Sequence, residues 1–423
     1  MRRYEIIFAI GSFLLMVSSI PFFIPDESNT GPNEKILDEQ VGNNFIKDPE
    51  IIGSYEGPIW PMYQFDQKRT GLSPFNATGN PGRVKRIVET VSIDTKWMLV
   101  DEGSNIYCFD YFANLNCYYP NFTLKWSNKI DYNGDIPIYY NNVLYLMNNK
   151  HLIAINIENG SFIFDIKTNS GQNCCYFLNY EKTRINIIID KYIEFKIFQY
   201  YPNGTFIEAF KIELPDTNHY IYGGTVPAIG SDDSIYFPYY NNTDYNHGIC
   251  AIYPNGTLKW IKSHDRHLGY PFLDKTDNIY YVSQYLGYYY QNGTLNWKIK
   301  VDAEGSPAIA PDGSIITGGS KIYSINPNGT LEWEKNYNME SKTLTVDSDG
   351  NILFCGKVPN NDNNYIIMLD RNGNFKWKTP ISNPSYPPVI MPNGELYVSN
   401  RDQDTDKYVL HILGKTKPEI PEI

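Results

Sequence analysis

Short runs of alternating hydrophobic and polar residues, separated by turns rich in Asn, Gly, Asp and Pro, dominate the chain after residue 60. In SINPNGTLEW (324–333), one such run precedes an Asn-Gly pair and another follows it. A period of two is typical of β-strands. Asn-Gly is a strong hairpin signal, because a type I′ turn requires positive φ at both central residues. The pattern therefore predicts consecutive antiparallel hairpins and no long amphipathic helix in this region.

The Asn-Gly hairpin recurs at a regular spacing of about 42 residues. Its turn asparagines are Asn121, which Phe122 follows in place of glycine, and Asn159, Asn203, Asn255, Asn292, Asn328 and Asn372. A second series of turns alternates with it, as in SPAIAPDGSII (306–316) and PPVIMPNGELYV (387–398). This period matches one four-stranded blade of a β-propeller. In such a blade the second series joins strands A and B, and the Asn-Gly series joins strands C and D.

The two ends of the repeat region predict how the ring of blades closes. The last unit supplies a third strand in KYVLHILG (407–414) and no fourth, whereas GRVKRIVET (82–90) resembles a fourth strand with no partner before it. The first complete unit begins around TVSIDTKWML (90–99). We therefore predict an all-β, eight-bladed propeller over residues 59–414, in which Val84–Thr90 completes the last blade. Closure removes the sheet edges that invite aggregation.

Tryptophan occupies one fixed place after most of the Asn-Gly turns. The set is Trp126, Trp260, Trp297, Trp333 and Trp377, with Phe164 and Phe210 in two other units. A large flat side chain repeated in each blade predicts a wedge between neighbouring blades. A stacking platform for ligands is the alternative interpretation.

The first 25 residues differ from the rest. Arg2 and Arg3 precede an uncharged, mostly apolar stretch at 6–25, which is close to the length of a membrane-spanning helix. The basic start keeps the N-terminus inside, so the propeller would lie outside the cytoplasm. We expect an uncleaved anchor; a cleaved signal peptide, and hence a secreted protein, is the alternative. Residues 26–58 are expected to be a flexible spacer, and 415–423 a C-terminal tail.

The net charge restricts the possible classes of partner, and the cysteine content indicates which disulfides are possible. The net charge of −11 argues against a nucleic-acid partner. Six cysteines in an exported chain allow disulfides. Cys108 and Cys117 flank eight residues and would lie side by side in a hairpin, which predicts a bridge. The adjacent Cys174 and Cys175 are either small core residues or an oxidised pair.

Several smaller motifs allow two interpretations each. Asp402, Asp404 and Asp406 alternate in RDQDTDK (401–407) and offer three oxygens to calcium, but a solvated hairpin tip has the same pattern. His264 and His267 lack a third zinc ligand, which favours a surface loop. Tyr-rich stretches at 237–248 and 284–293 are either binding surfaces or ordinary strand residues.

Eight Asn-x-Ser/Thr sequons are candidate glycosylation sites in an exported chain. They are Asn76, Asn121, Asn159, Asn203, Asn241, Asn255, Asn292 and Asn328. Six of them coincide with the C–D turns, where Asn-Gly-Thr also has a structural role of its own.

The stretch WPMYQFDQKRTGLSP (60–74), followed by units such as SPAIAPDGSI and KIYSINPNGTLEW, resembles the PQQ-like (pyrroloquinoline quinone) β-propeller repeat proteins. The resemblance covers about residues 60–414 and implies eight blades. The family includes quinoprotein dehydrogenases, which hold the quinone over calcium with an Asp as base and a vicinal disulfide against the quinone. It also includes the outer-membrane assembly lipoprotein of bacteria, which binds no quinone.

The dehydrogenase branch matches this chain less well than the lipoprotein branch. NCCYF (173–177) offers a vicinal cysteine pair, but no Glu, Asn and Asp set for calcium aligns, and no C-x-x-C-H haem motif is present. We therefore expect a membrane-anchored scaffold that binds a protein or glycan partner without catalysis or cofactor. The alternatives are a PQQ- and calcium-dependent dehydrogenase, and a hydrolase with carboxylates converging on the ring axis.

Overall fold

The computed structural model describes residues 58–415, all within one compact unit that spans Ile51–Ile423. Short segments inside this range lie outside the description: 60–61, 63–64, 91–92, 111–112, 131–136, 149–150, 169–173, 192–193, 213, 215–218, 222–226, 265–268, 304–305, 362, 383–387 and 402–407. The expected N-terminal helix (1–25) and residues 26–57 of the expected spacer also lie outside it. Within the described part, no helix is long and apolar enough to cross a membrane.

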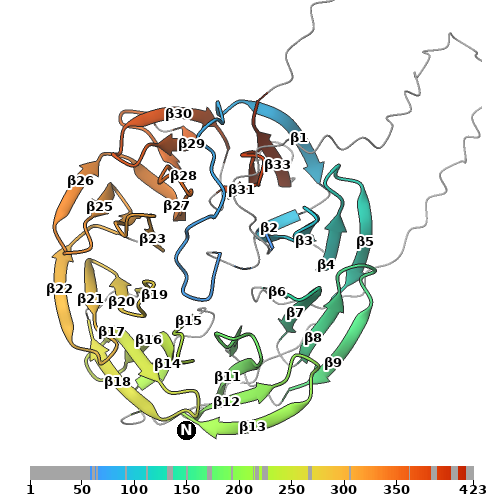
Figure 1. Ribbon diagram of the computed structural model, residues 1–423, viewed down its shortest axis with the longest axis vertical. Coiled ribbons are helices and arrows are strands. Elements are labelled where there is room, and N and C mark those ends of the chain that lie inside the picture. Colours follow the sequence, from blue (N-terminus) through green and yellow to red (C-terminus); the bar gives the residue numbers. More distant parts are fainter. Residues whose placement is uncertain are drawn as a thin grey trace, which may run out of the picture. The chain divides into compact units, whose positions relative to one another are not determined.

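Eight antiparallel sheets follow one another around a ring, as Figure 1 shows. Blade 1 contains β2 (Ile93–Val100), β3 (Ile106–Asp110), β4 (Asn114–Tyr118) and β5 (Leu124–Lys129). Blade 2 contains β6 (Ile138–Tyr140), β7 (Val143–Asn148), β8 (His151–Asn156) and β9 (Phe162–Lys167). Blade 3 contains β10 (Cys174–Leu178), β11 (Ile185–Lys191), β12 (Glu194–Tyr200) and β13 (Phe206–Lys211). Blade 4 contains β14 (His219–Ile221), β15 (Ala228–Ile229), β16 (Ile235–Asn241), β17 (Asn246–Ile252) and β18 (Leu258–Ser263), its innermost strand being in two pieces.

The remaining blades continue the same order from the axis outward. Blade 5 contains β19 (Tyr270–Leu273), β20 (Ile279–Val282), β21 (Tyr285–Tyr289) and β22 (Leu295–Lys300). Blade 6 contains β23 (Ala308–Ile309), β24 (Ile315–Gly318), β25 (Ile322–Ile325) and β26 (Leu331–Lys335). Blade 7 contains β27 (Asn338–Val346), β28 (Ile352–Lys357), β29 (Asn364–Leu369) and β30 (Phe375–Pro380). Blade 8 contains β31 (Val389–Ile390), β32 (Leu396–Arg401), β33 (Tyr408–Leu413) and β1 (Val84–Thr90).

The two ends of the repeat region meet in blade 8. Strand β1 pairs antiparallel with β33, from Val84 opposite Leu413 to Thr90 opposite Tyr408. In Figure 1 the blue strand β1 lies beside the dark red β33. The predictions of eight four-stranded blades and of closure by Val84–Thr90 are both confirmed.

The core lies between the faces of neighbouring sheets. One cluster joins Leu99 and Tyr107 of blade 1 to Tyr139 and Leu144 of blade 2, and all four are at most 4% exposed. Another joins blade 8 to blade 1 and includes Val100 and Leu410. Because every sheet has a neighbour on both faces, successive residues of the middle strands are buried, as in β20 and β24.

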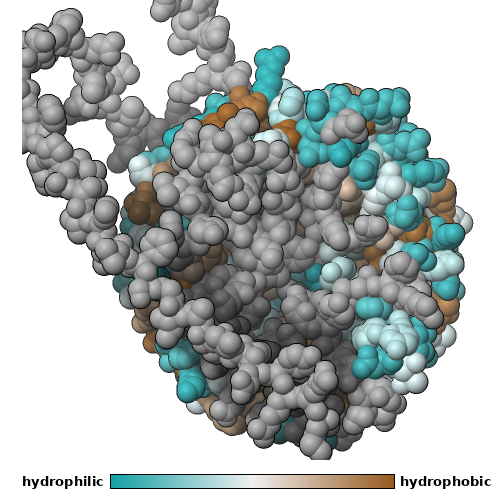
Figure 2. Space-filling model, turned by 180° about the vertical axis from the view of Figure 1, so that it is seen from behind, coloured by the Kyte–Doolittle hydropathy of each residue, from teal (hydrophilic) through white to brown (hydrophobic). Residues whose placement is uncertain are grey.

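The outer strands form the exposed edge of each blade, and lysine is concentrated there. The eight outer strands carry thirteen Lys or Arg residues and five Asp or Glu residues, although the whole chain is acidic. Charged side chains on edge strands discourage pairing with another chain. Exposed apolar residues such as Leu124, Phe206 and Phe375 begin these strands. Figure 2 shows hydrophobic residues interspersed with hydrophilic ones along the described part of the rim.

The C–D turns differ from the predicted type I′ geometry. In blade 6 the amide of Gly329 donates to Asn326 O at 2.8 Å, and φ is positive at Gly329 (+86°) but not at Asn328. The ladder then shifts by one residue between Ser324 and Ile325. A type I turn followed by a left-handed glycine and a bulge explains both features. The predicted hairpins form, but the turn requires only one residue with positive φ.

Each outer-strand tryptophan packs on a glycine with positive φ in the next blade, which is the C–D turn glycine in every case except Gly82 against Trp377. A Cβ atom added to Gly329 would lie 2.5 Å from the ring of Trp297, whose Nε1 donates to Pro327 O at 3.0 Å. Trp260 makes the same pair of contacts with Gly293 and with Gln291 O. The predicted wedge between blades is therefore confirmed, and the glycine is what makes room for the indole.

Blade 3 departs from this pattern. In the ladder of blade 6, Trp333 lies opposite Ser324; the matching residue of blade 3 is Glu208, opposite Gln199. Phe210 lies two residues further along β13, so its expected assignment to the tryptophan place is wrong. Phe164 does take that place in blade 2, against Gly204.

The closing junction replaces tryptophan and glycine with a different pair. Arg86 stands four residues after Gly82, as Trp377 stands four residues after Gly373. Its guanidinium carbon lies 5.0 Å from the ring centroid of Phe122, and Nη1 is 3.4 Å from Asn121 O. Phe122 has the turn position that glycine has elsewhere, with φ of +70°. A cation–π contact thus replaces the indole contact.

We expect Gly329→Ala to destabilise the ring by more than Gly313→Ala does. Both glycines have nearly the same φ, +86° and +88°, so both variants incur roughly 1–2 kcal/mol of backbone strain. Only the Gly329 variant also collides with Trp297, which adds about 1–3 kcal/mol. Denaturant unfolding of the two variants measures the difference. Equal losses would contradict the contact between indole and glycine.

A double-mutant cycle tests the closing junction. Arg86→Trp alone is expected to destabilise the ring, because Phe122 fills the space that a tryptophan needs at the other junctions. In the background of Phe122→Gly the same change should restore the repeated contact, with a coupling energy of at least about 1 kcal/mol. Thermal or denaturant unfolding of the four proteins gives this energy. Additive effects would show that the two positions do not form one contact.

Candidate functional site

An extended N-terminal segment, residues 65–80, crosses one face of the ring, and we call it the strap (Figure 1). Four of its carbonyl groups, those of Gln67, Lys68, Thr70 and Gly71, each accept a hydrogen bond from the last residue of an innermost strand. The donors are the amides of Ile229, Leu273, Ile309 and Val346, at 2.8–3.1 Å, in blades 4 to 7. The strap therefore satisfies backbone donors at the axis that have no partner within their own sheet at this end.

The strap also reaches the blades on either side of these four. Gln67 Nε2 donates to Asn179 O of blade 3 at 2.6 Å. Ala77 N donates to Asp347 Oδ2 at 2.9 Å, and Asn80 Nδ2 donates to Gly394 O and Leu413 O of blade 8. A single segment thus contacts six consecutive blades before it continues into β1.

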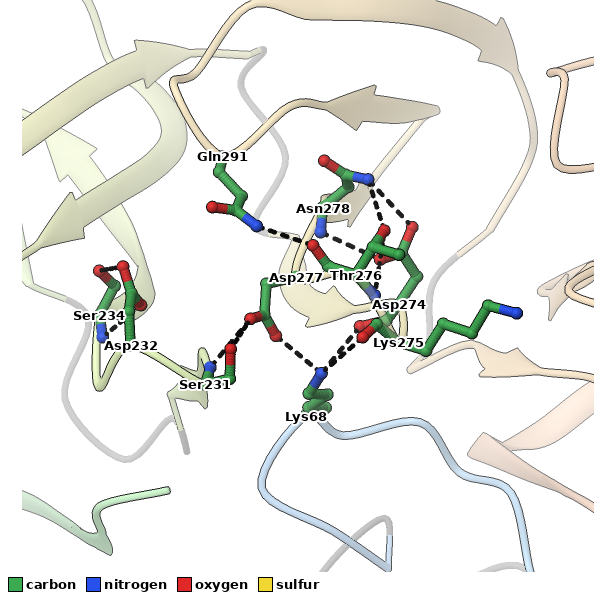
Figure 3. Close-up of polar contacts among 10 residues, drawn as sticks. All are labelled: Lys68, Ser231, Asp232, Ser234, Asp274, Lys275, Thr276, Asp277, Asn278 and Gln291. Carbon is green, nitrogen blue, oxygen red and sulfur yellow. Dashed lines mark hydrogen bonds and ion pairs between the residues drawn. The ribbon is translucent and has the colours of Figure 1, made fainter. Parts of the chain in front are cut away.

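A buried ion pair attaches the strap to two A–B turns (Figure 3). Lys68 Nζ lies 2.7 Å from Asp277 Oδ1, and the two side chains are 14% and 9% exposed. The same ammonium donates to Asp274 O and Lys275 O at 3.2 and 3.3 Å. Asp277 Oδ2 accepts from the amide of Ser231 at 3.0 Å and from its hydroxyl. The three ammonium protons face three oxygens, so this site holds blades 4 and 5 together and keeps no donor for a ligand.

Asp66 carries the half-buried carboxyl group of the strap. It accepts from Thr70 N at 2.9 Å and from Thr70 Oγ1 at 2.6 Å. Burial raises the pKa of Asp66 above its usual value, and the hydrogen bonds from Thr70 only partly oppose that rise. Nearby, Arg69 is 2% exposed and its guanidinium carbon lies 5.8 Å from the centroid of Tyr270. Both charged side chains help to fill the space between the strap and the blades.

The predicted bridge between Cys108 and Cys117 does not form. Both thiols are free and buried. In the β3–β4 hairpin Cys108 lies opposite Asn116, while Cys117 lies opposite Tyr107. Because neighbouring residues of a strand point to opposite faces, the two thiols are on opposite faces of blade 1. The expectation that the hairpin brings them side by side is therefore wrong.

Cys175 has the surroundings of a core residue. It packs in a cluster with Phe177, Ile188 and Phe195 between blades 3 and 4. A vicinal disulfide that faces a quinone would need to lie open to the axis, so Cys175 does not fit the role that the family resemblance implied. The side chain of Cys174 is outside the described part.

The other candidate residues do not form a site in the described part of the chain. Asp402, Asp404, Asp406 and His267 fall outside it, and no three His, Cys, Asp or Glu side chains within it are arranged to hold a metal ion. His264 Nδ1 lies 3.1 Å from Ser283 Oγ, and its ring packs 4.7 Å from that of Tyr281.

The two Tyr-rich stretches contain mostly strand residues. Phe237 and Tyr239 are 1% exposed and Tyr289 is 5% exposed, whereas Tyr245 and Tyr290, at turns, are 60% and 44% exposed. The interpretation as strand residues holds for the buried members. The exposed members remain candidates for partner contacts.

The sequence pattern does not predict the strap. Its residues were recognised only as part of the stretch that carries the family resemblance. Two local signals were available: an Asp followed four residues later by a Thr, which now proves to be a hydrogen-bonded pair, and the absence of strand-like alternation in 65–74. Neither signal indicates which blades the segment contacts.

Comparisons with solved structures identify the same architecture in other proteins. The structure of BamB from Moraxella catarrhalis matches with a TM-score of 0.54 at 14% identity, covering 79% of this chain and 99% of that one. The Dos1 propeller matches with a TM-score of 0.54 at 9% identity, covering 80% and 97%. No family model and no curated protein matches the chain. The chain is an eight-bladed β-propeller whose fold is similar to that of BamB, and at these identities the likeness shows the fold alone.

Asp66→Asn should make the ring more stable relative to the parent as the pH rises. Because the folded state raises the pKa of Asp66, the unfolded chain loses this proton first, starting near pH 3.8. Stability then falls as the pH rises toward the raised pKa, by about 1.4 kcal/mol for each pH unit that separates the folded and unfolded pKa values. The neutral amide of the variant removes that fall. Denaturant unfolding between pH 3 and 7 measures the difference.

Asp312→Asn is a control for which we expect the opposite dependence of stability on pH. Burial alone would raise the pKa of Asp312, but hydrogen bonds from Ser314 and Arg371 outweigh it and the pKa is lowered. This carboxylate stabilises the fold above pH 3.8, and the stabilisation is lost as the pH falls through the lowered pKa. Relative to the parent, the variant should therefore weaken with rising pH. Parallel profiles for the two variants would contradict the burial of an acidic Asp66.

Proposed function

We propose that this chain is an exported propeller, anchored in a membrane by residues 1–25, that binds a protein or glycan partner without catalysis. The observation that carries the proposal is the strap, which spans blades 3 to 8 at one end of the axis. A ring held together in this way is a rigid platform, and a preorganised platform loses little conformational entropy when a partner binds. A kinship with the non-enzymatic outer-membrane assembly lipoprotein is part of the same proposal.

The partner would bind at the end of the ring away from the strap. In a four-stranded meander the A–B and C–D turns share one end, and the B–C and D–A connections share the other. The strap bonds to A–B turns through Lys68 and Ala77, so it occupies the first end. Loops on a rigid scaffold usually carry binding residues. The D–A connections reach eight residues, between β5 and β6 and between β30 and β31, which makes them the longer loops.

A quinone-dependent dehydrogenase remains the alternative that the family resemblance raises. The burial of Cys175 among apolar side chains gives it no support from the described residues. A hydrolase would require carboxylates converging at the axis, whereas the buried carboxylates next to the strap, Asp66 and Asp347, are hydrogen-bonded to Thr70 and to Ala77 and Asn351. These carboxylates bind the strap and the turns.

Cross-linking from defined positions tests both the binding role and the face. We expect a photoreactive residue in place of Ser320 or Asn336, at the end away from the strap, to cross-link a partner in intact cells. The same residue in place of Lys275, in an A–B turn, should not. All three positions are exposed. Cross-links from Lys275 alone would contradict the proposed face.

Two further measurements test location and chemistry. The full chain should sediment with membranes, require detergent for release, and be cleaved by protease added to intact cells. A chain found in the cytoplasm would contradict the anchor and export. Alcohol-dependent dye reduction after addition of quinone and calcium to the full chain would contradict a role without catalysis.

A further inference from the structure

The outer C–D turns and the inner A–B turns share one backbone geometry. In blade 6 the αL glycines are Gly329 in the outer turn and Gly313 in the inner one, with φ of +86° and +88°. Asn328 Oδ1 accepts from Thr330 N at 3.1 Å in the outer turn. Asp312 Oδ1 accepts from Ser314 N at 3.0 Å in the inner turn. The side-chain acceptor of this hydrogen bond is therefore an amide oxygen in the outer turn and a carboxylate oxygen in the inner turn.

Across the ring the residue before the αL position varies in the inner turns and is constant in the outer turns. The inner turns of this type have Gly103, Glu181, Asp232, Thr276, Asp312, Asp349 and Asn393. The outer turns have Asn121, Asn159, Asn203, Asn255, Asn292, Asn328 and Asn372. The geometry of the turn therefore does not require asparagine, although the outer turns always have it.

In six of these outer turns the amide oxygen of the asparagine accepts a hydrogen bond from the backbone amide two residues later. Oδ1 of Asn121, Asn255 and Asn328 accepts both the amide and the hydroxyl of the Thr two residues later. An aspartate could accept both bonds equally well. Within the described residues no hydrogen bond reaches Nδ2 of the six asparagines that Ser or Thr follows at this spacing, and all six are exposed. The hydrogen bonds of the turn therefore give the amide oxygen a structural role and give the amide nitrogen none.

We propose that Asn121, Asn159, Asn203, Asn255, Asn292 and Asn328 carry N-linked glycans, which form a crown on the strap-bearing end of the ring. This inference rests on the proposed export. The donor would be an oligosaccharide on a polyprenyl phosphate, used by a membrane transferase. The bond between the sugar C1 and the phosphate oxygen breaks, C1 bonds to Nδ2, the Nδ2 proton passes to a base of the transferase, and the lipid phosphate leaves.

The glycan crown would restrict partner binding to the end of the ring away from the strap. C–D turns lie at the same end of each blade as the A–B turns that the strap contacts, so glycans there would cover that end. The B–C and D–A connections would stay uncovered. Asn76 and Asn241 are half-buried and belong to the strap and to the end of β16, so they are not part of the crown.

Mass spectrometry of the full chain purified from its own membranes tests the proposal. We expect peptides that contain the six asparagines to carry a saccharide mass. Asn328→Asp keeps the turn oxygen, so it should remove one glycan and leave the melting temperature unchanged. The seventh outer turn offers a gain: Asn374→Thr creates a sequon at the exposed Asn372 and should add one glycan. Asn372→Asp combined with Asn374→Thr should add none.

Protease access to intact cells is measured on the same samples. An outward-facing chain whose six asparagines are unmodified would overturn the glycan crown and leave the proposed function intact. A chain that protease cannot reach would overturn export and the crown together. Failure of Asn374→Thr to add a glycan on a chain that carries the other six would show that exposure in this turn does not select the acceptor.

Discussion

The pairing of β1 with β33 is the constraint on which the ring depends. The chain supplies only three strands to blade 8 from its C-terminal part, and the fourth comes from more than 300 residues earlier. Without β1, the ladder partners of β33 would be exposed as an open edge, and the core shared by blades 8 and 1 would lose one wall. Gly414 N donates to Arg83 O at 2.9 Å, just beyond the ladder, so both chain segments are held where they meet.

The strap and β1 are consecutive parts of one segment. The same segment therefore contacts the blades at one end of the ring and forms the outer strand that closes it. Asn80 lies between them and donates to Gly394 O and Leu413 O, in blade 8 itself. Blade 8 has no C–D turn to hold its outer strand. Trp377 against Gly82, the Lys85–Glu395 ion pair at 2.5 Å and Arg86 over Phe122 hold β1 in place instead. A covalent connection in seven blades is thus replaced by side-chain contacts in the eighth.

The features that repeat along the sequence were predicted correctly. Predictions that depend on the exact strand register of a single residue were wrong. The period, the closing strand and the tryptophan wedges are periodic signals, and each was confirmed. The Cys108–Cys117 bridge failed because Phe109 pairs with Leu115 across the turn, which sets Cys108 opposite Asn116. A shift of one residue moves a side chain to the other face of a sheet. Phe210 failed for a related reason, since it lies two residues beyond the tryptophan place. The strap was not predicted, because its partners are set by long-range contacts.

The two ends of the ring therefore have different physical characters, and this difference bears on function. At one end the strap, the Lys68–Asp277 pair and the hydrogen-bonded Asp66 fix the blades relative to one another through backbone hydrogen bonds, charges and packing. Exposed residues in the connections at the other end, such as Ser320 and Asn336, take no part in these contacts, so they can vary at little cost in stability. The contacts of the strap that fix the blades thus lie at one end of the ring, which is the arrangement expected of the binding scaffold proposed above.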